Sequence, residues 1–351
     1  MELDSLDLSR VDPGGMYLRV SELPDQILEA WNLVQYLDLP ESYRDVSNAV
    51  VLGMGGSAIG ADLVRTLVED SAKVPMQVVR DYRIPAYVSD SSLVIASSYS
   101  GNTEETLSAL DEAIAVGAKC VAVGTGGKLE QRAEDAGVPF VAFEYQSAPR
   151  AAIGYSFMLI AGVLRAAALI DMHEPDFKRA AEVMRSLQRE IAPEVPTESN
   201  AAKQLAQKLH QRVPAVYGAG ILSEVARRWK GQFNENSKAW AFFEVMPELN
   251  HNAVLGYANP LHAQENLAVV MLRSDLDHPR VKVRYDVTAR LLQERGVPCH
   301  SVWARGETAV EHMLSTIHFG DYVSIYLAYL YGSDPTPVDA IAYLKEQLAQ
   351  A

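Results

Sequence analysis

The chain has 351 residues, more than two typical domain lengths, and can therefore bury cores in two compact units. Its hydrophobic fraction of 48% with 22% charged residues is that of a globular protein and excludes an intrinsically disordered one. The 31 Lys and Arg residues against 45 Asp and Glu give a net charge of −14, which disfavours a nucleic-acid-binding or anionic-membrane-binding surface.

Targeting signals and cysteines point to an intracellular chain. No apolar run approaches the roughly 20 residues of a membrane span, and the opening MELDSLDLSR lacks the basic and then apolar pattern of a signal peptide. We therefore expect a soluble cytoplasmic protein. Cys120 and Cys299 each lie in or just before a short apolar run, which predicts reduced thiols in strands rather than a disulfide or a metal site.

The predicted elements alternate between strands and helices. The stretch LPDQILEAWNLVQYL predicts an N-terminal helical extension over residues 1–48. Residues 49–170 alternate short apolar runs (AVVLG, MQVV, LVIASSY, KCVAVG, VPFVAF) with helical periods, the pattern of parallel strands with crossover helices. A helical stretch interrupted by APEVP and PTESN predicts a linker over 171–212. A second α/β domain is predicted over 213–335 and a C-terminal helix over 336–351.

The α/β pattern occurs twice in the chain. NAVVLGMGGSAIGADLV aligns with VPAVYGAGILSEVARRW, and AVGAKCVAVG aligns with QERGVPCHSV. Such self-similarity indicates a duplicated α/β unit. The copies differ after one apolar strand, where the first has SSYSGNTEET and the second has RSDLDHPRVK. Only the first copy therefore keeps a hydroxyl-rich loop.

The segment VLGMGGSAIGAD places four glycines between a strand and a helix, with Ser57 at the turn. Glycine lets the backbone approach a ligand closely, and a helix N-terminus favours an anion, so a phosphate fits here. The same glycines satisfy a relaxed dinucleotide-binding fingerprint with Asp81 as the candidate ribose ligand, which leaves an NAD(P)-dependent oxidoreductase open. A glycine-rich turn without a ligand is the third interpretation.

A second loop, from Ser98 to Thr106, follows the strand LVIAS and begins a helix. Asn102 with Glu105 three residues later predicts a capping box, which is the structural explanation of the loop. The hydroxyls of Ser98, Ser100 and Thr103 exceed what a cap needs, and such neutral donors suit a phosphate at a helix N-terminus.

With these two loops the sequence resembles the sugar isomerase (SIS) domain, and the duplication resembles the bifunctional phosphoglucose/phosphomannose isomerases. The resemblance covers nearly the whole chain and includes the blocks SAPRAAIGYSF, KGQFNENSKAW, PELNHNAVLGY and VDAIAYLKEQL. It implies an α/β fold of two tandem SIS domains, each a parallel sheet flanked by helices in a flavodoxin-like three-layer sandwich. It also implies the phosphate-binding residues Gly56, Ser57, Ser98, Ser100 and Thr103.

The resemblance further implies reversible isomerisation of glucose 6-phosphate and mannose 6-phosphate with fructose 6-phosphate through a cis-enediol. This chemistry needs a base between C2 and C1, a group that opens the ring and a cation near the developing oxyanion. Glu235 matches the family's base, with Glu244 and Glu248 as nearby alternatives. The remaining matches are His251 for ring opening, Lys345 for ring opening or hydroxyl binding, and Arg150 for the enediolate.

No cofactor or metal is expected for this reaction, and the eight histidines include no His-Glu-x-x-His motif. The resemblance implies a homodimer in which His251 serves the partner's site, with hexose 6-phosphates as ligands and neither nucleic acid nor membrane as a partner. A non-catalytic SIS sensor of sugar phosphates is the main alternative. It would keep the serine loops without needing Glu235, His251 or Lys345.

Overall fold

The computed structural model describes residues 2–348 and 350, except for the side chains of residues 261–263. The chain forms two compact units. The first, called the serine-loop unit, comprises Glu22–Met184 and Gly306–Glu311. The companion unit comprises Met1–Ser21, Arg185–Arg305 and His312–Ala351. The chain passes between the two at four points, of which one lies within helix α8 (Glu174–Ile191) and one within helix α13 (Ala309–Tyr331).

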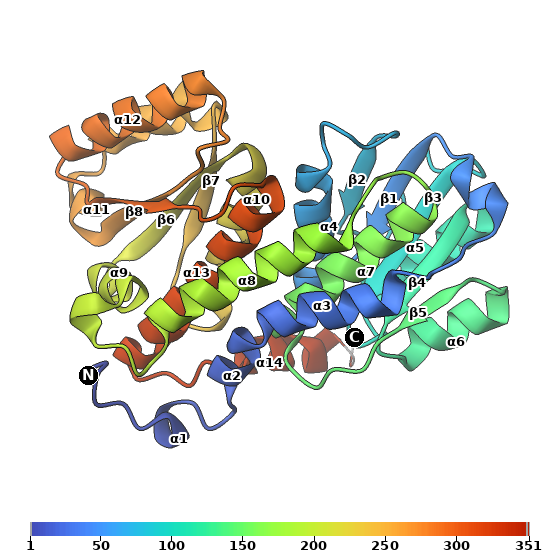
Figure 1. Ribbon diagram of the computed structural model, residues 1–351, viewed down its shortest axis with the longest axis horizontal. Helices are drawn as coiled ribbons and strands as arrows, with labels where there is room; N and C mark the ends of the chain where they lie inside the picture. The colour runs from blue at the N-terminus through green and yellow to red at the C-terminus, as the bar shows by residue number, and fades with distance from the viewer. Residues whose placement is uncertain (1, 349, 351) are drawn as a thin grey trace. The chain divides into compact units, whose positions relative to one another are not determined.

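The serine-loop unit is built on a five-stranded parallel sheet in the order β2-β1-β3-β4-β5 (Figure 1). This is the doubly wound order in which ligands bind at the carboxyl ends of β1 and β3, where the strand order reverses. Its elements are α3 (Leu23–Val34), η1 (Glu41–Arg44), β1 (Asn48–Leu52), α4 (Gly55–Leu67), β2 (Met76–Val79), β3 (Ser92–Ser98), α5 (Glu104–Ala115), β4 (Lys119–Gly124), α6 (Gly127–Ala136), β5 (Phe140–Ala142), η2 (Pro149–Ala151) and α7 (Ile153–Ala166).

Helices cover both faces of this sheet because its strands are buried on both sides. β3 is buried along its whole length, as expected for a central parallel strand. On one face, Leu107 and Leu110 of α5 and Leu129 of α6 pack on Val94 and other alternate strand residues. Helices α4 and α7 pack together on the other face, and α3 packs on α7. The three layers place the β1–α4 and β3–α5 loops side by side at one edge.

The companion unit repeats this plan with a four-stranded parallel sheet in the order β7-β6-β8-β9. Its strands correspond to β2, β1, β3 and β4. Its elements are α1 (Leu8–Val11), α2 (Met16–Ser21), η3 (Thr197–Ser199), α9 (Ala201–Leu209), β6 (Val213–Ala219), η4 (Gly220–Leu222), α10 (Ser223–Glu235), β7 (Phe242–Met246), η5 (Glu248–His251), η6 (Ala253–Ala258), α11 (Leu261–Asn266), β8 (Leu267–Arg273), α12 (Pro279–Glu294), β9 (Cys299–Trp303) and α14 (Asp339–Leu348).

The predicted α/β class with two helix-flanked parallel sheets is confirmed. Two local predictions differ from the structure. The sequence does not predict strand β7, because Met246 is the only one of its five residues that is buried and the strand therefore lacks a continuous apolar, buried run. The capping box of Asn102 and Glu105 is wrong, since the N-cap of α5 is Thr103. The Asn102 amide instead donates to the Ser100 carbonyl at 2.9 Å and accepts from the Lys128 N–H at 3.2 Å.

Both cysteines are free and lie in strands, with Cys120 buried in β4 and Cys299 half-buried in β9. Burial raises the pKa of the Cys120 thiol to about 12 and that of Cys299 to about 11. These thiols are therefore protonated and unreactive at neutral pH. Within the described part of the chain, no helix has the length and apolar character needed to cross a membrane.

Candidate active site

The predicted site residues fall into two groups. The phosphate-binding candidates and Arg150 belong to the serine-loop unit, whereas Glu235, His251 and Lys345 belong to the companion unit.

The glycine loop joins β1 to α4 at the carboxyl edge of the sheet. Gly55 has a φ of +50°, which favours glycine, and begins the helix. Gly56 packs so closely on the next segment that a Cβ there would stand 2.7 Å from the Pro149 carbonyl oxygen. Ser57 is buried, and its Oγ accepts the backbone N–H of Tyr99 at 3.1 Å. The loop therefore brings the helix N-terminus, a serine hydroxyl and the adjacent strand end together.

The serine loop joins β3 to α5 beside the glycine loop. The hydroxyls of Ser98 and Thr103 lie 2.9 Å apart, and Thr103 makes no side-chain cap to its own helix. Ser100 is exposed, and its Oγ accepts the Asn102 N–H at 3.2 Å. Gly101 has a φ of +65° and fits against the backbone of Gly126, where a Cβ would clash. The structure thus gathers the predicted hydroxyls around one helix N-terminus, where the helix dipole favours an anion.

Arg150 lies in the 3-10 turn η2, immediately before α7, and is only 2% exposed. A guanidinium so deeply buried has little freedom, because burial of a charge requires partners and fixed geometry. The close approach of Gly56 to Pro149 places this turn directly against the glycine loop. The structure therefore brings Arg150 into the same corner of the unit as the phosphate-binding candidates.

Glu235 is the last residue of α10 and is half-buried. The helix is held on α13 by a buried network in which the Arg228 guanidinium donates to both carboxylate oxygens of Asp321 at 2.9 and 3.2 Å. Gln232 donates to the same carboxylate at 2.8 Å. The next residue after Glu235, Asn236, donates to Ser324 Oγ at 3.0 Å. These contacts fix the end of the helix and therefore the origin of the Glu235 side chain.

His251 closes the short 3-10 turn η5 and is exposed. The turn is anchored by Leu249, which is fully buried, and by Asn250, which donates to Thr288 Oγ1 at 2.9 Å. The predicted alternatives lie close by in sequence, with Glu244 in β7 and Glu248 at the start of η5. Glu248 accepts a 2.8 Å hydrogen bond from the Asn252 amide, which commits it to the local turn.

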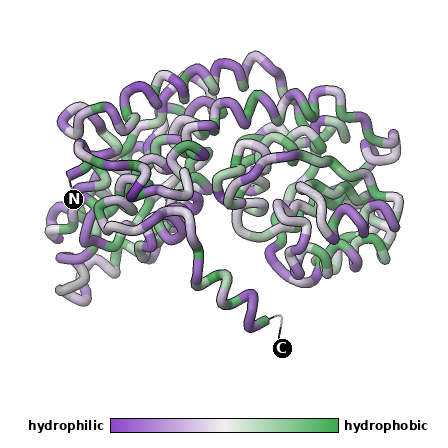
Figure 2. Tube along the Cα trace, turned by 90° about the horizontal axis from the view of Figure 1, so that it is seen from below, coloured by the Kyte–Doolittle hydropathy of each residue, from purple (hydrophilic) through white to green (hydrophobic). Residues whose placement is uncertain are grey.

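Lys345 lies on α14, and none of the ten residues of this helix is buried. Figure 2 shows hydrophobic and hydrophilic stretches alternating along the helix. Ile341, Leu344 and Leu348 are all exposed, and their i, i+3 and i+7 spacing places them on one side.

Two further features of the described residues bear on the chemistry. No group of three or more His, Cys, Asp or Glu side chains among them is placed to hold a metal ion. A hollow of about 390 Å³ lies in the companion unit between β9, α9 and α13, but none of the predicted site residues lines it.

The sequence analysis did not identify several residues whose hydrogen bonds hold the candidate loops and helix α10 in place. Tyr99 lies inside the serine loop, yet its role is to donate its N–H to Ser57 and its hydroxyl to the Tyr145 carbonyl. Arg228 and Asp321, which fix α10, are 93 residues apart. The sequence signal for Tyr99 is its place between two candidate serines, whereas nothing local in the sequence marks the Arg228–Asp321 pair.

The sequence and the fold are both similar to those of known sugar-phosphate isomerases. Residues 198–348 match the family described as the bacterial phospho-glucose isomerase C-terminal SIS domain. A glucose-6-phosphate isomerase-like protein from Thermus thermophilus has the same fold with a TM-score of 0.60 and 20% identity over 96% of this chain and 98% of that one. A glucose-6-phosphate isomerase from Chlamydia trachomatis matches with a TM-score of 0.67 and 12% identity, over 93% and 72%. The fold is that of the SIS-type isomerases.

Sequence relatives narrow the class. The bifunctional phosphoglucose/phosphomannose isomerase of Caldicellulosiruptor bescii is 43% identical over 336 residues, which cover 95% of this chain and 99% of the relative. The protein of the same name from Aquifex aeolicus is 34% identical over 91% of this chain and 95% of its own. The chain belongs to the family of bifunctional phosphoglucose/phosphomannose isomerases. The predicted family and isomerase class are confirmed, and neither the sensor nor the oxidoreductase is favoured.

Proposed function

We propose that the protein interconverts glucose 6-phosphate and mannose 6-phosphate with fructose 6-phosphate through a cis-enediol, without a metal. The observation that carries the proposal is the meeting of the Ser98 and Thr103 hydroxyls, 2.9 Å apart, at the N-terminus of α5 beside the Ser57 loop. Family membership supplies the reaction, and this corner supplies a place for the phosphate.

The phosphate is held by neutral donors rather than by surface cations. Ser57, Ser98, Ser100 and Thr103 offer hydroxyls, and the first turns of α4 and α5 offer backbone N–H groups and two helix dipoles. The close approach of the backbone at Gly56 keeps the glycine loop compact. In a protein with a net charge of −14 such local donors are needed, because the overall field repels a dianion.

Proton transfer is assigned to Glu235. Its carboxylate takes the proton from C2 of the open-chain aldose, the C2–H electrons form the C1–C2 double bond, and the π electrons of the C1 carbonyl move to O1, which is protonated in the enediol. The same group then returns a proton to C1 as the O2–H proton is lost and the C2 carbonyl forms. Arg150 stabilises the negative charge that develops on the oxygens of the enediolate. His251 opens the ring by moving a proton between the ring oxygen and the hydroxyl at C1, assisted by Lys345.

Activity towards both epimers follows from the intermediate. C2 is planar in the enediol, so its configuration is lost, and reprotonation on one face or the other gives glucose or mannose 6-phosphate. One base serves both reactions when the pocket lets the enediol rotate about its C2–C3 bond, so that either face of C2 can be presented to the base. We expect a cytoplasmic homodimer in which His251 of each chain serves the site of the other.

The test of the base is a coupled assay of fructose 6-phosphate formation from each aldose phosphate. Glu235→Gln keeps the shape and loses the basicity, so we expect both activities to fall by about 100- to 10,000-fold with sugar-phosphate affinity nearly unchanged. Glu244→Gln is the matched control and should stay near wild type. Loss of one activity alone would refute a shared base.

The absence of a metal is tested separately. Exhaustive dialysis against EDTA should leave turnover unaffected.

The test of the dimer is complementation between two inactive variants. Arg150→Ala and His251→Ala homodimers should each be nearly inactive. When they are unfolded and refolded together, about half of the dimers are mixed, and each mixed dimer has one undamaged site. Roughly a quarter of wild-type activity should then return. No recovery, with mixed dimers confirmed by mass spectrometry, would place His251 in its own chain's site or outside catalysis.

A further inference from the structure

The turn that carries Arg150 is held from two sides within the serine-loop unit. On one side it lies against the glycine loop, where a Cβ on Gly56 would stand 2.7 Å from the Pro149 oxygen and 3.2 Å from the Arg150 nitrogen. Any side chain at position 56 would therefore displace the turn. On the other side it meets Gln26 of α3, a residue outside every motif of the family resemblance.

Gln26 is 1% exposed, and its amide is fully used. Nε2 donates to the Ala151 carbonyl at 2.8 Å and to the Tyr145 hydroxyl at 2.9 Å, while Oε1 accepts the Gly154 N–H at 3.1 Å. Both donors and the acceptor are thus engaged by residues on either side of Arg150. A buried amide with all three hydrogen bonds formed holds its partners in place. Movement of the turn would break these bonds and leave buried polar groups without partners and without water.

A glycine makes this contact possible. A Cβ at Gly154, in the first turn of α7, would stand 2.6 Å from Gln26 Cβ. Since Gly154 has no Cβ, the beginning of α7 can approach α3 closely enough for its N–H to reach the amide. The turn is consequently held between Gly56 on one side and Gln26 with Gly154 on the other.

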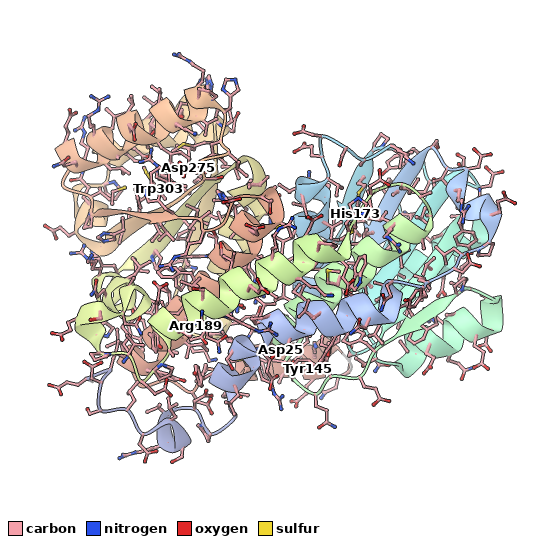
Figure 3. The ribbon with its side chains drawn as sticks, viewed as in Figure 1. Asp25, Tyr145, His173, Arg189, Asp275 and Trp303 are labelled. Atoms are coloured by element: carbon pink, nitrogen blue, oxygen red, sulfur yellow. The ribbon has the colours of Figure 1, made fainter. Side chains whose placement is uncertain are left out.

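The same amide is connected to the phosphate corner through two tyrosines. The Tyr145 hydroxyl donates to Glu22 at 2.6 Å and accepts from Gln26, and Figure 3 shows Tyr145 close to α3. The Tyr99 hydroxyl donates to the Tyr145 carbonyl and accepts the Ser147 N–H at 2.9 Å. Because the Tyr99 N–H also binds Ser57 Oγ, the chain from residue 145 to 154 is tied to both ligand loops.

We propose that Gln26 is a positioning residue for the isomerisation, acting by holding the Arg150 turn in register with the phosphate-binding loops. This inference rests on the role proposed above for Arg150. A transition-state charge is stabilised only by a cation held at the correct place in advance, and displacement of about 1 Å can cost about 100-fold in rate. Gln26 therefore acts on the chemical step through Arg150 without touching the substrate.

The test compares Gln26→Met, which keeps the length and loses all three hydrogen bonds, with Gln35→Met just beyond the end of the same helix. The side chain of Gln35 donates to Asn32, three residues away, in an exposed contact. We expect Gln26→Met to lower kcat by between about 10- and 100-fold with KM changed less than about threefold. Gln35→Met should leave both constants unchanged. An unaltered kcat in folded Gln26→Met would overturn the proposal.

A double-variant experiment separates positioning from mere stability. In an Arg150→Ala background, adding Gln26→Met should lower the residual kcat no further, because the group it positions is gone. An equal loss of kcat in both backgrounds would mean that Gln26 acts elsewhere. If Arg150→Ala alone leaves kcat intact, the role proposed for Arg150 fails instead, so the two failures are distinguishable.

Gln26→Glu provides a second variant if the methionine disrupts folding. It keeps the acceptor for Gly154 and loses both donors, but its protonated form regains one donor. Burial raises the pKa of such a carboxyl. The kcat of Gln26→Glu relative to wild type should therefore rise as pH falls through that pKa. A ratio that does not change with pH, with near-UV circular dichroism like that of wild type, would contradict the role of the donors.

Discussion

The two units share a strand order and differ in what stands at the carboxyl end of the third strand. In the serine-loop unit, β3 ends in Ser98, whose hydroxyl meets that of Thr103 at a helix N-terminus. In the companion unit, β8 ends before Ser274, whose Oγ accepts the Leu276 N–H at 3.0 Å and pairs with His312 Nδ1 at 2.8 Å. The Ser98 hydroxyl therefore pairs with a second hydroxyl of the serine loop, whereas the Ser274 hydroxyl is bound to a backbone N–H and a histidine ring.

A carboxylate reinforces this difference. Asp277 accepts the Ser274 N–H at 3.3 Å, and its Oδ1 lies 3.4 Å from where a Cβ of Gly220 would be. Gly220 follows β6 at the place where the glycine loop follows β1. The Asp277 carboxylate therefore lies between the loop that follows β6 and the loop that follows β8, where an anion would otherwise bind. Burial raises the pKa of this carboxyl group. The two copies share a scaffold and differ in a few loop residues, and these residues set apart the copy that we propose to bind the phosphate.

The largest effect is expected from a variant that loses hydrogen-bond donors in the serine loop only. Ser100→Ala with Thr103→Ala should raise KM for both hexose phosphates, because each donor to a charged acceptor contributes roughly 1–3 kcal/mol. The combined rise in KM is then at least about 30-fold and should appear equally for both aldose phosphates. Steady-state kinetics with each substrate measures it.

The matched control for that experiment is Ser274→Ala in the companion unit. It should leave KM unchanged and lower stability instead, because it leaves the buried His312 Nδ1 and the Leu276 N–H without this partner. An unchanged KM in the serine-loop double variant would return that loop to a purely structural role.

A second comparison concerns the helices that follow each sheet. A Cβ on Gly162 of α7 would stand 2.4 Å from Val34 Cβ, and one on Gly320 of α13 would stand 2.1 Å from the Trp229 ring. Gly162→Ala and Gly320→Ala should each destabilise the protein by about 1–3 kcal/mol through overpacking. The rigid indole can yield less, so Gly320→Ala should have the lower urea midpoint.

Gly231 in α10 is the control for this pair, since no atom of the described residues outside its own helix backbone lies within 4 Å of its would-be Cβ. Gly231→Ala should raise stability by about 0.5–1 kcal/mol, as expected for alanine in a helix interior. Destabilisation by all three substitutions would contradict the steric explanation.

The smallest expected effect is a change with pH in the free energy of unfolding, and it arises from one histidine of the companion unit. His318 of α13 is fully buried, neither ring nitrogen has a hydrogen-bond partner among the described residues, and burial lowers its pKa from 6.5 to about 3. The unfolded chain binds a proton below pH 6.5 that the folded protein does not, so His318 lowers stability as pH falls below that value. Between pH 7 and 5.5 this amounts to about 1 kcal/mol.

His318→Leu should remove this part of the acid lability. Urea unfolding at about pH 7 and about pH 5.5 should show a smaller loss of stability for the variant than for wild type. Equal losses in the two proteins would mean that the ring is protonated or solvated in the folded state.

The strands and the ligand loops are predictable from the sequence because both depend on local patterns. Apolar runs of five to seven residues mark buried parallel strands, and glycines and hydroxyls mark the turns between them. Strand β7 escapes prediction because it has no continuous buried run. The Asn102 capping box fails because a tertiary contact with Lys128 outcompetes the local one. Gln26 cannot be found from local sequence, since its partners in this network are 119 to 128 residues away.

The exposed α14 has a consequence for how Lys345 works. An isolated helix shorter than about 12–15 residues is only marginally stable in water, and this one has ten residues with none buried. Its backbone amides should therefore exchange with solvent far faster than those of β3 or α7. In the role proposed for it above, Lys345 would act only while this helix is folded. The contribution of Lys345 to turnover would then follow a local coil–helix equilibrium, which temperature and helix-stabilising cosolvents would shift while the two sheets stay intact.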